Sequence, residues 1–227
     1  MSAHLFQQTG AAGLVQMITL ATQHGLTRLA EAALRAMSHM TADADRLAAH
    51  NAGGGRVIAE CLNTFPASLG IARAALVAGL YRAWGGGLAP FHDARVPTST
   101  VIQAVVAAMK RFPMDTLVQQ GGVRLLDCHA RSQHKLVETP AVVVAVAAAM
   151  RTFVHDGVIQ HLGASAIASV NGIQPRELKR AHAKAGYNAI HVTSVALAVS
   201  SPPSLQIGGR SWQEVVMATY PRMRERA

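Results

Sequence analysis

The residue type in this chain best suited to chemistry is histidine, which occurs eleven times. The nearest approach to a constellation is His155 with Asp156 and His161. Their spacing matches neither HExxH nor HxH, and no further carboxylate is placed to complete a zinc site. We therefore interpret these histidines as surface residues and expect no bound metal.

Other catalytic patterns are also missing from the sequence. The acidic residues are few and scattered, so none form a general acid–base pair. The glycine triplets at 53–55 and 85–87 belong to no strand–loop–helix unit and no Gly-Lys-Ser/Thr follows them, which indicates inter-helix turns. No GxSxG elbow is present. We expect no catalytic residue, no cofactor and no small-molecule substrate.

The composition predicts an all-α protein. Half of the 227 residues are hydrophobic but only 4% are aromatic, so Ala, Val, Leu, Ile and Met must build the core. Cores of this kind are typical of close-packed helices, because alanine has the highest helix propensity and lets backbones approach.

The same data give an expectation about compartment. Cys61 and Cys128 lie in apolar segments without CxxC spacing, which predicts reduced thiols. The longest apolar run, 139–150, ends at Arg151 and is shorter than the ~20 residues that span a bilayer, and the N-terminal stretch lacks an early Lys or Arg. We expect an intracellular, reducing location without membrane insertion, the cytoplasm being favoured and an organellar assembly being the alternative.

A pattern of two helical segments joined by a short turn recurs five times along the chain, and we call it the frame. Its register position is held by Ala30, Ala72, Gln119, Gln160 and Gln206, at spacings of 42, 47, 41 and 46 residues. An aliphatic second helix precedes each register position, and a short polar turn, often with proline, leads to a third helix. A shorter first element precedes the second helix at 43–54, 132–141 and 175–187, whereas unit one keeps only its tail. Fixed periods of this length indicate repeat architectures, here with units at about 1–40, 41–87, 88–131, 132–174 and 175–227.

Small residues follow each register position. They are Ala74 and Ala75, Gly121 and Gly122, Gly163 and Ala164, and Gly208 and Gly209. Helices pack 8–10 Å apart only where small side chains line the crossing. We therefore expect Gly122→Leu to overpack the array and destabilise it by roughly 1–3 kcal/mol.

The stretch RLAAHNAGGGRVIAECLNTFPASLGIARAALVAGL, residues 46–80, resembles an armadillo repeat. In that family a polar short helix ends at an Ala-Gly-Gly turn, a second helix runs to a turn that contains proline, and a third helix begins with small residues. The resemblance covers essentially the whole chain and is degenerate in unit five. It implies a right-handed α-solenoid whose third helices line a concave groove. Pairs of helices of the HEAT type are the alternative, against which the short first helix argues.

The groove departs from the peptide-binding members of the family. The family's Asn-ladder places hold His39, Tyr81, Cys128, Ser169 and Val215, and its Trp places hold Arg35, Val77, Arg124, Ser165 and Ser211. Recognition of an extended nuclear-localisation peptide in that mode is therefore not expected. Arg35 and Arg124 instead present positive charge to an acidic partner, or are simply solvated helix positions.

Positive charge is concentrated near the C-terminus. The formal net charge is +9, and residues 176–227 hold eight Lys and Arg against three Glu. Arg176, Arg180 and Lys184 recur at every fourth residue with Lys179 beside them, which predicts a basic ridge on one helix face. A second basic cluster contains Arg222, Arg224 and Arg226. The two clusters form either a partner-binding surface or a solvated face.

These features favour a binding protein. The first unit exposes Leu5, Phe6 and Leu14 without an obvious polar cap, and an uncapped repeat end needs a cover. We interpret the chain as a non-enzymatic protein–protein interaction or scaffold subunit of a larger assembly, binding other protein subunits with acidic surfaces. The alternative is an RNA-associated structural subunit of a ribonucleoprotein, held through the basic C-terminal unit. An enzyme is the third choice.

Overall fold

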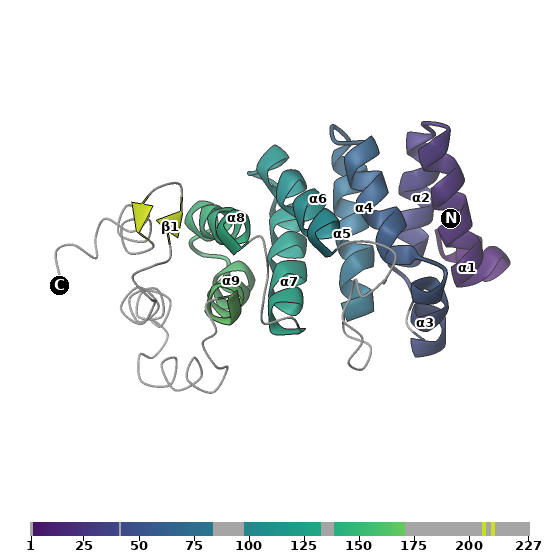
Figure 1. The fold of residues 1–227 in the computed structure, drawn as a ribbon. Helices are drawn as coiled ribbons and strands as arrows, with labels where there is room; N and C mark the ends of the chain where they lie inside the picture. Colours follow the sequence, from purple (N-terminus) through teal and green to yellow (C-terminus); the bar gives the residue numbers. More distant parts are fainter. Residues whose placement is uncertain are drawn as a thin grey trace.

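A computed structural model describes residues 2–40, 42–83, 98–132, 139–170, 206–207 and 210–211. Within these ranges the chain is helical except for two short strands, which confirms the all-α class (Figure 1). The elements are α1 (Ser2–Gln23), α2 (Thr27–Met37), α3 (Asp43–Asn51), α4 (Gly54–Thr64), α5 (Leu69–Ala83), α6 (Thr98–Arg111), α7 (Thr116–Ser132), α8 (Thr139–Thr152), α9 (Gly157–Val170), β1 (Gln206–Ile207) and β2 (Arg210–Ser211).

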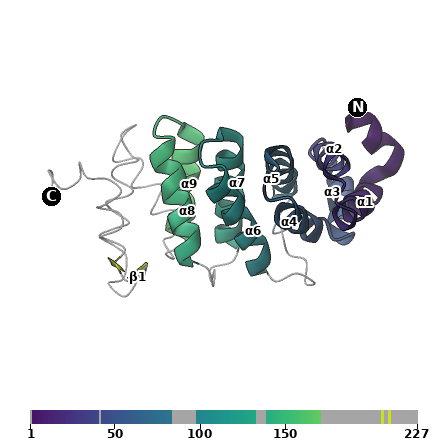
Figure 2. The same cartoon turned by 90° about the horizontal axis from the view of Figure 1, so that it is seen from above.

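The helices follow one another along the molecule in chain order and form two layers (Figures 1 and 2). The predicted second helices, α1, α4, α6 and α8, each contact the next one in the series. The predicted third helices, α2, α5, α7 and α9, do the same. Each second helix also contacts the third helix of its own unit. The helices of neighbouring units therefore pack against one another from α1 to α9.

The short α3 is the first element predicted for unit two, and it contacts α1, α4 and α5. In unit one, α1 is two helical segments merged across a kink at Gly10, whose φ of 63° lies in the left-handed region that glycine tolerates. The kink separates the predicted tail of the first element from the second helix. Residues 133–138 and 175–187, which hold most of the other two predicted first elements, lie outside the described part.

The core runs between the two layers and is built from small and aliphatic side chains, including Val57, Ile58, Leu76 and Val146. Leu14, expected on an exposed face of unit one, is fully buried. That expectation was wrong because α2, α3 and α4 all pack against α1.

The register position has the same structure in units three and four. The side-chain Nε2 of Gln119 donates to the carbonyl oxygens of Met109 and Phe112, at 2.8 and 3.0 Å. The Nε2 of Gln160 donates to those of Met150 and Phe153, at 2.6 and 3.0 Å. Both amides are almost fully buried. They satisfy carbonyl groups that a helix end leaves without an intrahelical partner.

In units two, three and four, the side chain four residues before the register position caps the third helix. Ser68 Oγ accepts from the Ile71 backbone N–H, and Asp115 Oδ1 accepts from that of Val118. Asp156 Oδ1 accepts from the N–H groups of Val158 and Ile159. Ser and Asp are favoured at such N-caps because they satisfy donors that the first helical turn leaves over.

The glycines of α7 and α9 lie at close approaches, as predicted. A Cβ added to Gly122 would lie 2.5 Å from Met109 Cγ in α6, and one added to Gly121 would lie 2.9 Å from Leu76 Cβ in α5. Gly163 has the same relation to Met150, with Sδ at 2.6 Å from an added Cβ. Gly121 therefore lets neighbouring units approach, whereas Gly122 and Gly163 let the two helices of one unit approach.

The frame fails at its fifth position. The third helix predicted to begin near Gln206 is replaced over the described residues by the strands β1 and β2, in which Gln206 pairs with Ser211 and Ile207 with Arg210. Gly208 and Gly209 stand between the strands in the sequence, and Gly-Gly is a preferred pair for a two-residue hairpin turn. Gly208 and Gly209 themselves lie outside the described residues.

Candidate functional site

Polar side chains directly after the register position connect neighbouring units. The guanidinium of Arg73 on α5 donates from Nε to both carboxylate oxygens of Asp115, at 3.2 and 3.1 Å, and from Nη2 to Oδ2. One unit further along, Gln120 Nε2 donates to Asp156 Oδ2 at 2.7 Å. Each contact joins a third helix to the N-cap of the next third helix, so it fixes how adjacent units stack.

Unit one has a related contact. The Glu31 carboxylate on α2 occupies the space where a Cβ of Gly70 would lie, in the first turn of α5. A negative side chain is favourable there because the helix N-terminus carries partial positive charge.

The pKa of Asp115 lies below its ordinary value. The main cause is the hydrogen bond from Arg73, and the backbone N–H of Val118 adds to it. The carboxylate therefore has two roles: it caps α7 through the backbone N–H of Val118, and it pairs with the guanidinium of Arg73.

The two cations predicted for the groove differ from each other. Arg35 on α2 is exposed but forms a 2.5 Å ion pair with Glu31, one turn earlier. Arg124 on α7 is half-buried, and its buried Nε has no hydrogen-bond partner among the described residues. The helix α5 packs against both α2 and α7, so Arg35 and Arg124 do not lie on neighbouring third helices. The structure does not bring them together into one basic surface.

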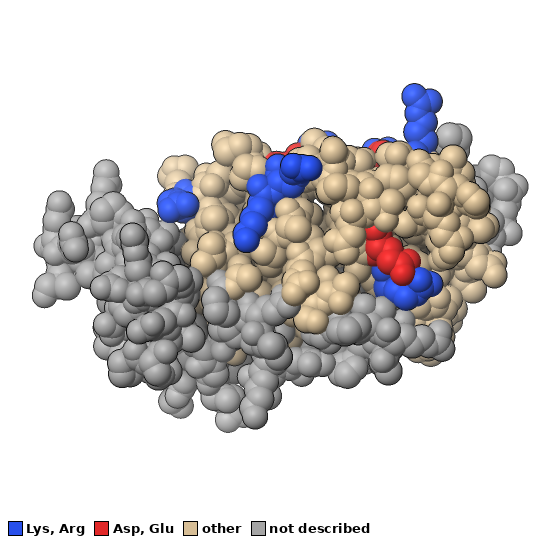
Figure 3. Space-filling model, turned by 45° about the horizontal axis from the view of Figure 1, so that its top comes forward, with Lys and Arg blue, Asp and Glu red and all other residues tan. Residues whose placement is uncertain are grey.

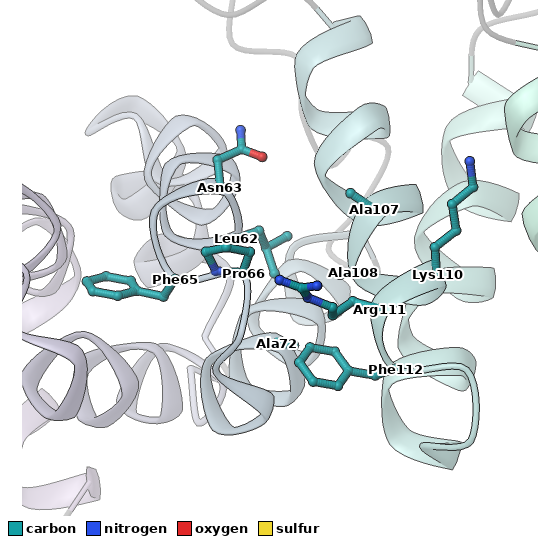
Figure 4. A pocket seen from close by; sticks show the side chains of 10 residues that line it. All are labelled: Leu62, Asn63, Phe65, Pro66, Ala72, Ala107, Ala108, Lys110, Arg111 and Phe112. Atoms are coloured by element: carbon teal, nitrogen blue, oxygen red, sulfur yellow. The ribbon is translucent and has the colours of Figure 1, made fainter.

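A cleft opens between the ends of the second helices of units two and three. It encloses about 420 Å³ and is open to solvent. Its walls come from the end of α4 and the following turn, from α5, and from the last two turns of α6 (Figure 4). The lining residues are Leu62, Asn63, Phe65, Pro66, Ala72, Ala107, Ala108, Lys110, Arg111 and Phe112.

Arg111 is the charged side chain that extends into this cleft. Figure 4 shows its guanidinium between Leu62 and Pro66 on one side and Phe112 on the other, whereas Lys110 points away from the centre. Within the described part of the chain, neither cation is hydrogen-bonded or ion-paired.

The carboxylates nearest in the chain to these elements are already paired. Glu60 on α4 accepts from Arg56 at 2.6 Å, and Asp115 accepts from Arg73. The walls of the cleft are therefore mainly apolar, and the charged group that extends into it is the guanidinium of Arg111.

Sequence reasoning missed Arg111, although the repeat register contains the signal. Eight residues before the register position, units one, two and four have Thr22, Thr64 and Thr152, and only unit three has an arginine. The preceding place holds Ala21, Asn63, Lys110 and Arg151, so a cation recurs there. Arg111 therefore departs from the repeat pattern, whereas Lys110 has a counterpart in Arg151 of unit four.

Exposed apolar side chains gather at the turns between second and third helices, and the turns of units one to three lie along the upper edge in Figure 1. We call this edge the turn edge. Leu20, Leu26, Met114, Leu117 and Val154 lie in or beside these turns, and Met114 is 75% exposed. Figure 3, in which this edge is brought forward, shows Lys and Arg side chains dispersed over a mostly uncharged surface with fewer acidic groups. The edge combines apolar and cationic groups.

The side chains of the remaining predicted partner-binding residues are not among those that the structure describes. Leu5 and Phe6 belong to the first segment of α1, but their side chains are not among those described. The C-terminal cations Arg176, Lys179, Arg180, Lys184, Arg222, Arg224 and Arg226 lie outside the described residues.

The described residues contain little that resembles a reactive centre. Asp156, the acidic member of the His155–His161 group, is the N-cap of α9. Over the described ranges, no three His, Cys, Asp or Glu residues are grouped so as to hold a metal ion. Cys61 is a buried thiol 3.2 Å from Thr22 Oγ1, and burial raises its pKa, which makes it a poor nucleophile. None of the helices in these ranges has the length and apolar character needed to cross a membrane.

Comparisons with family models, with curated proteins and with solved structures found no match to this chain.

Proposed function

We propose that this chain is an armadillo-like α-solenoid that serves as a protein-interaction or scaffold subunit of a larger assembly. The observation that carries the proposal is the repeated packing. Second helices contact second helices and third helices contact third helices from α1 to α9. An array built only from contacts between neighbours displays long open surfaces, and such proteins use these surfaces to bind other macromolecules.

The armadillo type of repeat is favoured over the HEAT type by α3. In unit two a short polar helix precedes the aliphatic α4 and ends at a glycine turn, where Gly53 has a φ of 88°. A HEAT unit would consist of α4 and α5 alone.

A protein partner is favoured over RNA by the character of the exposed surface. Single-stranded RNA grooves use aromatic side chains on which bases stack. The turn phenylalanines Phe65, Phe112 and Phe153 are half-buried and pack against the hydrophobic core. The exposed apolar side chains on the turn edge are instead non-aromatic, and Met114 is the most exposed of them. Apolar and methionine-containing patches are typical of protein-binding surfaces.

The proposal is tested by isolating the full chain from its native cells with an affinity tag, after cross-linking at the native expression level. We expect one or a few proteins to co-purify in fixed stoichiometry and to stay bound after RNase treatment. A chain that elutes alone at its own mass of 23.9 kDa from such an extract would contradict the proposal.

RNA binding is the second candidate, and it rests on the formal charge of +9. If it is correct, the affinity for single-stranded RNA falls steeply with salt because phosphate contacts release counterions. Complete loss of the co-purifying proteins after RNase treatment, together with such a salt slope, would support this candidate. Absence of RNA binding at low salt would eliminate it.

A further inference from the structure

We propose that the cleft between α4 and α6 binds an acidic linear segment of a partner protein. An apolar side chain of that segment inserts beside Pro66 and Phe112, and a carboxylate of the same segment pairs with Arg111. This inference rests on the proposed function as an interaction subunit, and it names the surface and the chemistry of the partner.

The guanidinium of Arg111 is available to a partner. Its guanidinium lies between the two walls of the cleft (Figure 4), and it has no hydrogen bond or ion pair within the described residues. A guanidinium presents a planar set of donors that matches a carboxylate in a bidentate manner. Arg73, one unit away, shows this pairing within the chain, because it binds both oxygens of Asp115.

The second argument comes from the repeat. A cation in the last turn of a helix is favourable because the carbonyl ends carry partial negative charge, and this alone is a structural reason for Lys110 and Arg111. However, α1, α4 and α8 have threonine at the place of Arg111. The Thr22 hydroxyl donates to the backbone oxygen of Ile18 at 2.7 Å, so a threonine satisfies the local structure by itself. The arginine is therefore not required by the fold of the unit.

The third argument is the size and apolar character of the cleft. A volume of about 420 Å³ is sufficient for a large side chain and part of its backbone. Leu62, Ala72 and Ala108 are buried in its walls, and Pro66 and Ala107 are exposed beside it. The turn that carries Phe112 also exposes Met114, which extends the apolar surface beyond the cleft. An apolar anchor with adjacent acidic residues complements both features.

The experiment begins with a display library of linear peptides selected on the folded full chain. We expect the enriched peptides to combine Asp or Glu with a neighbouring Leu, Phe or Met. One synthetic peptide from this selection then serves as the probe for affinity measurements. Enrichment of peptides without acidic residues, or no enrichment, would overturn the proposal.

Two substitutions test the site in different ways. Arg111→Thr introduces the residue of the other three units and removes the charge, and Ala107→Trp fills the cleft without changing the charge. We expect each to weaken probe binding by about tenfold or more. For Arg111→Thr this corresponds to the loss of one charge-assisted hydrogen bond, and for Ala107→Trp the cause is steric exclusion of the segment's apolar side chain. Circular dichroism and melting temperature establish that each variant is folded.

Arg151→Thr is the matched control. Arg151 is an exposed cation at the end of α8, and its loss changes the net charge by the same amount as Arg111→Thr. We expect this control to leave the affinity unchanged. Equal weakening by Arg111→Thr and Arg151→Thr would show a general electrostatic attraction and would overturn the assignment of the cleft.

The outcomes also separate this inference from the proposed function. If a protein partner or a selected peptide binds equally well to wild type, Arg111→Thr and Ala107→Trp, the cleft is the wrong surface and the interaction role stands. If the chain binds no protein or peptide but binds a single-stranded oligonucleotide RNA, both proposals fail.

Discussion

Gln119 and Gln160 make the same pair of hydrogen bonds in two different units. Each amide donates to carbonyl oxygens ten and seven residues earlier, at the end of its second helix and in the following turn. Units one and two have Ala30 and Ala72 at this position, so the amide is not needed for the helix pair to form. Once present and buried, however, the amide is a donor to the carbonyl oxygen at the helix end, whereas the turn carbonyl oxygen also accepts from a backbone N–H, that of Asp115 or Asp156.

We therefore predict that Gln119→Leu lowers the free energy of unfolding by about 1–3 kcal/mol, the cost of leaving buried polar groups without a partner. Urea denaturation followed by circular dichroism measures this change. Gln16→Leu, the same substitution at an exposed position of α1, is the control and is expected to change stability by less than about 0.5 kcal/mol. Equal effects at the two positions would contradict the role assigned to Gln119.

The ion pair of Arg73 with Asp115 predicts a pH dependence. The pKa of Asp115 is lowered in the folded state, mainly by Arg73, so its contribution to stability is present above the unfolded pKa of about 4. That contribution is lost as the pH falls through the lower folded pKa. We expect Asp115→Asn to be less stable than wild type at neutral pH and to lose less stability on acidification.

Urea denaturation at a series of pH values between neutral and strongly acidic tests this prediction. Asp45→Asn, in the first turn of α3, is the control for removal of one carboxylate. The prediction fails if wild type and Asp115→Asn lose the same stability as the pH falls.

At the scale of the element, the two helices of each unit carry a pair of residues thirteen positions apart in a fixed register. The pairs are Leu20 with Ala33, Leu62 with Ala75, Met109 with Gly122, and Met150 with Gly163. In units three and four the methionine occupies the space that a Cβ on the glycine would need. A long flexible side chain thus accompanies glycine, and leucine accompanies alanine.

This pattern predicts a compensating pair of substitutions. Gly122→Ala is expected to destabilise the protein by roughly 1–3 kcal/mol, because its Cβ would meet Met109. Adding Met109→Leu recreates the pair of units one and two, and we expect it to recover much of that loss. The double-mutant cycle, measured by urea denaturation, should give a coupling free energy of about 0.5–3 kcal/mol.

Gly157→Ala is the control for the helix propensity of alanine, because a Cβ there meets no atom within 4 Å. We expect Gly157→Ala to be no less stable than wild type. If the changes in unfolding free energy caused by the substitutions at 109 and 122 simply add, the two residues are not energetically coupled and the prediction fails.

At the scale of the whole molecule, we expect stability in the proposed array to pass from unit to unit through neighbouring contacts. Gly121 lies where α7 approaches Leu76 of α5, at the junction of units two and three. Because a repeat array behaves as a one-dimensional series of coupled units, a weak junction separates the unfolding of its two sides.

We predict that Gly121→Leu, by overpacking this junction, uncouples α1–α5 from α6–α9. Hydrogen exchange measured by mass spectrometry in increasing urea should show one shared transition for wild type and two separate transitions for the variant. Gly157→Leu, at a position with open space, is the matched control and should keep the single transition. A single transition in Gly121→Leu at lower urea would mean that the array unfolds as one unit regardless of this contact.

Much of the fold was predictable because the signals are local. The frame at Ala30, Ala72, Gln119 and Gln160 follows from helical periodicity, turn residues and small residues, all of which act within a few tens of residues. The fifth position was predicted wrongly because Gly208 and Gly209 suit both close helix packing and a hairpin turn. A glycine pair alone does not distinguish these structures.

The candidate site was less predictable, as three arginines illustrate. Arg35, Arg73 and Arg111 are all exposed helical arginines, and nothing adjacent in the sequence separates their roles. Arg35 is neutralised by Glu31 on its own helix, and Arg73 is neutralised by Asp115, which lies 42 residues further along the chain. Arg111 pairs with no carboxylate of the described residues and extends into a cleft.

The sequence by itself determined the helical class, the spacing of the units and the positions where helices must approach closely, because these depend on local propensity and side-chain size. Only the tertiary structure decided which cation is available to a partner. Pairing of charges depends on what lies within hydrogen-bonding distance after units have stacked, and those groups come from parts of the chain that are distant in sequence.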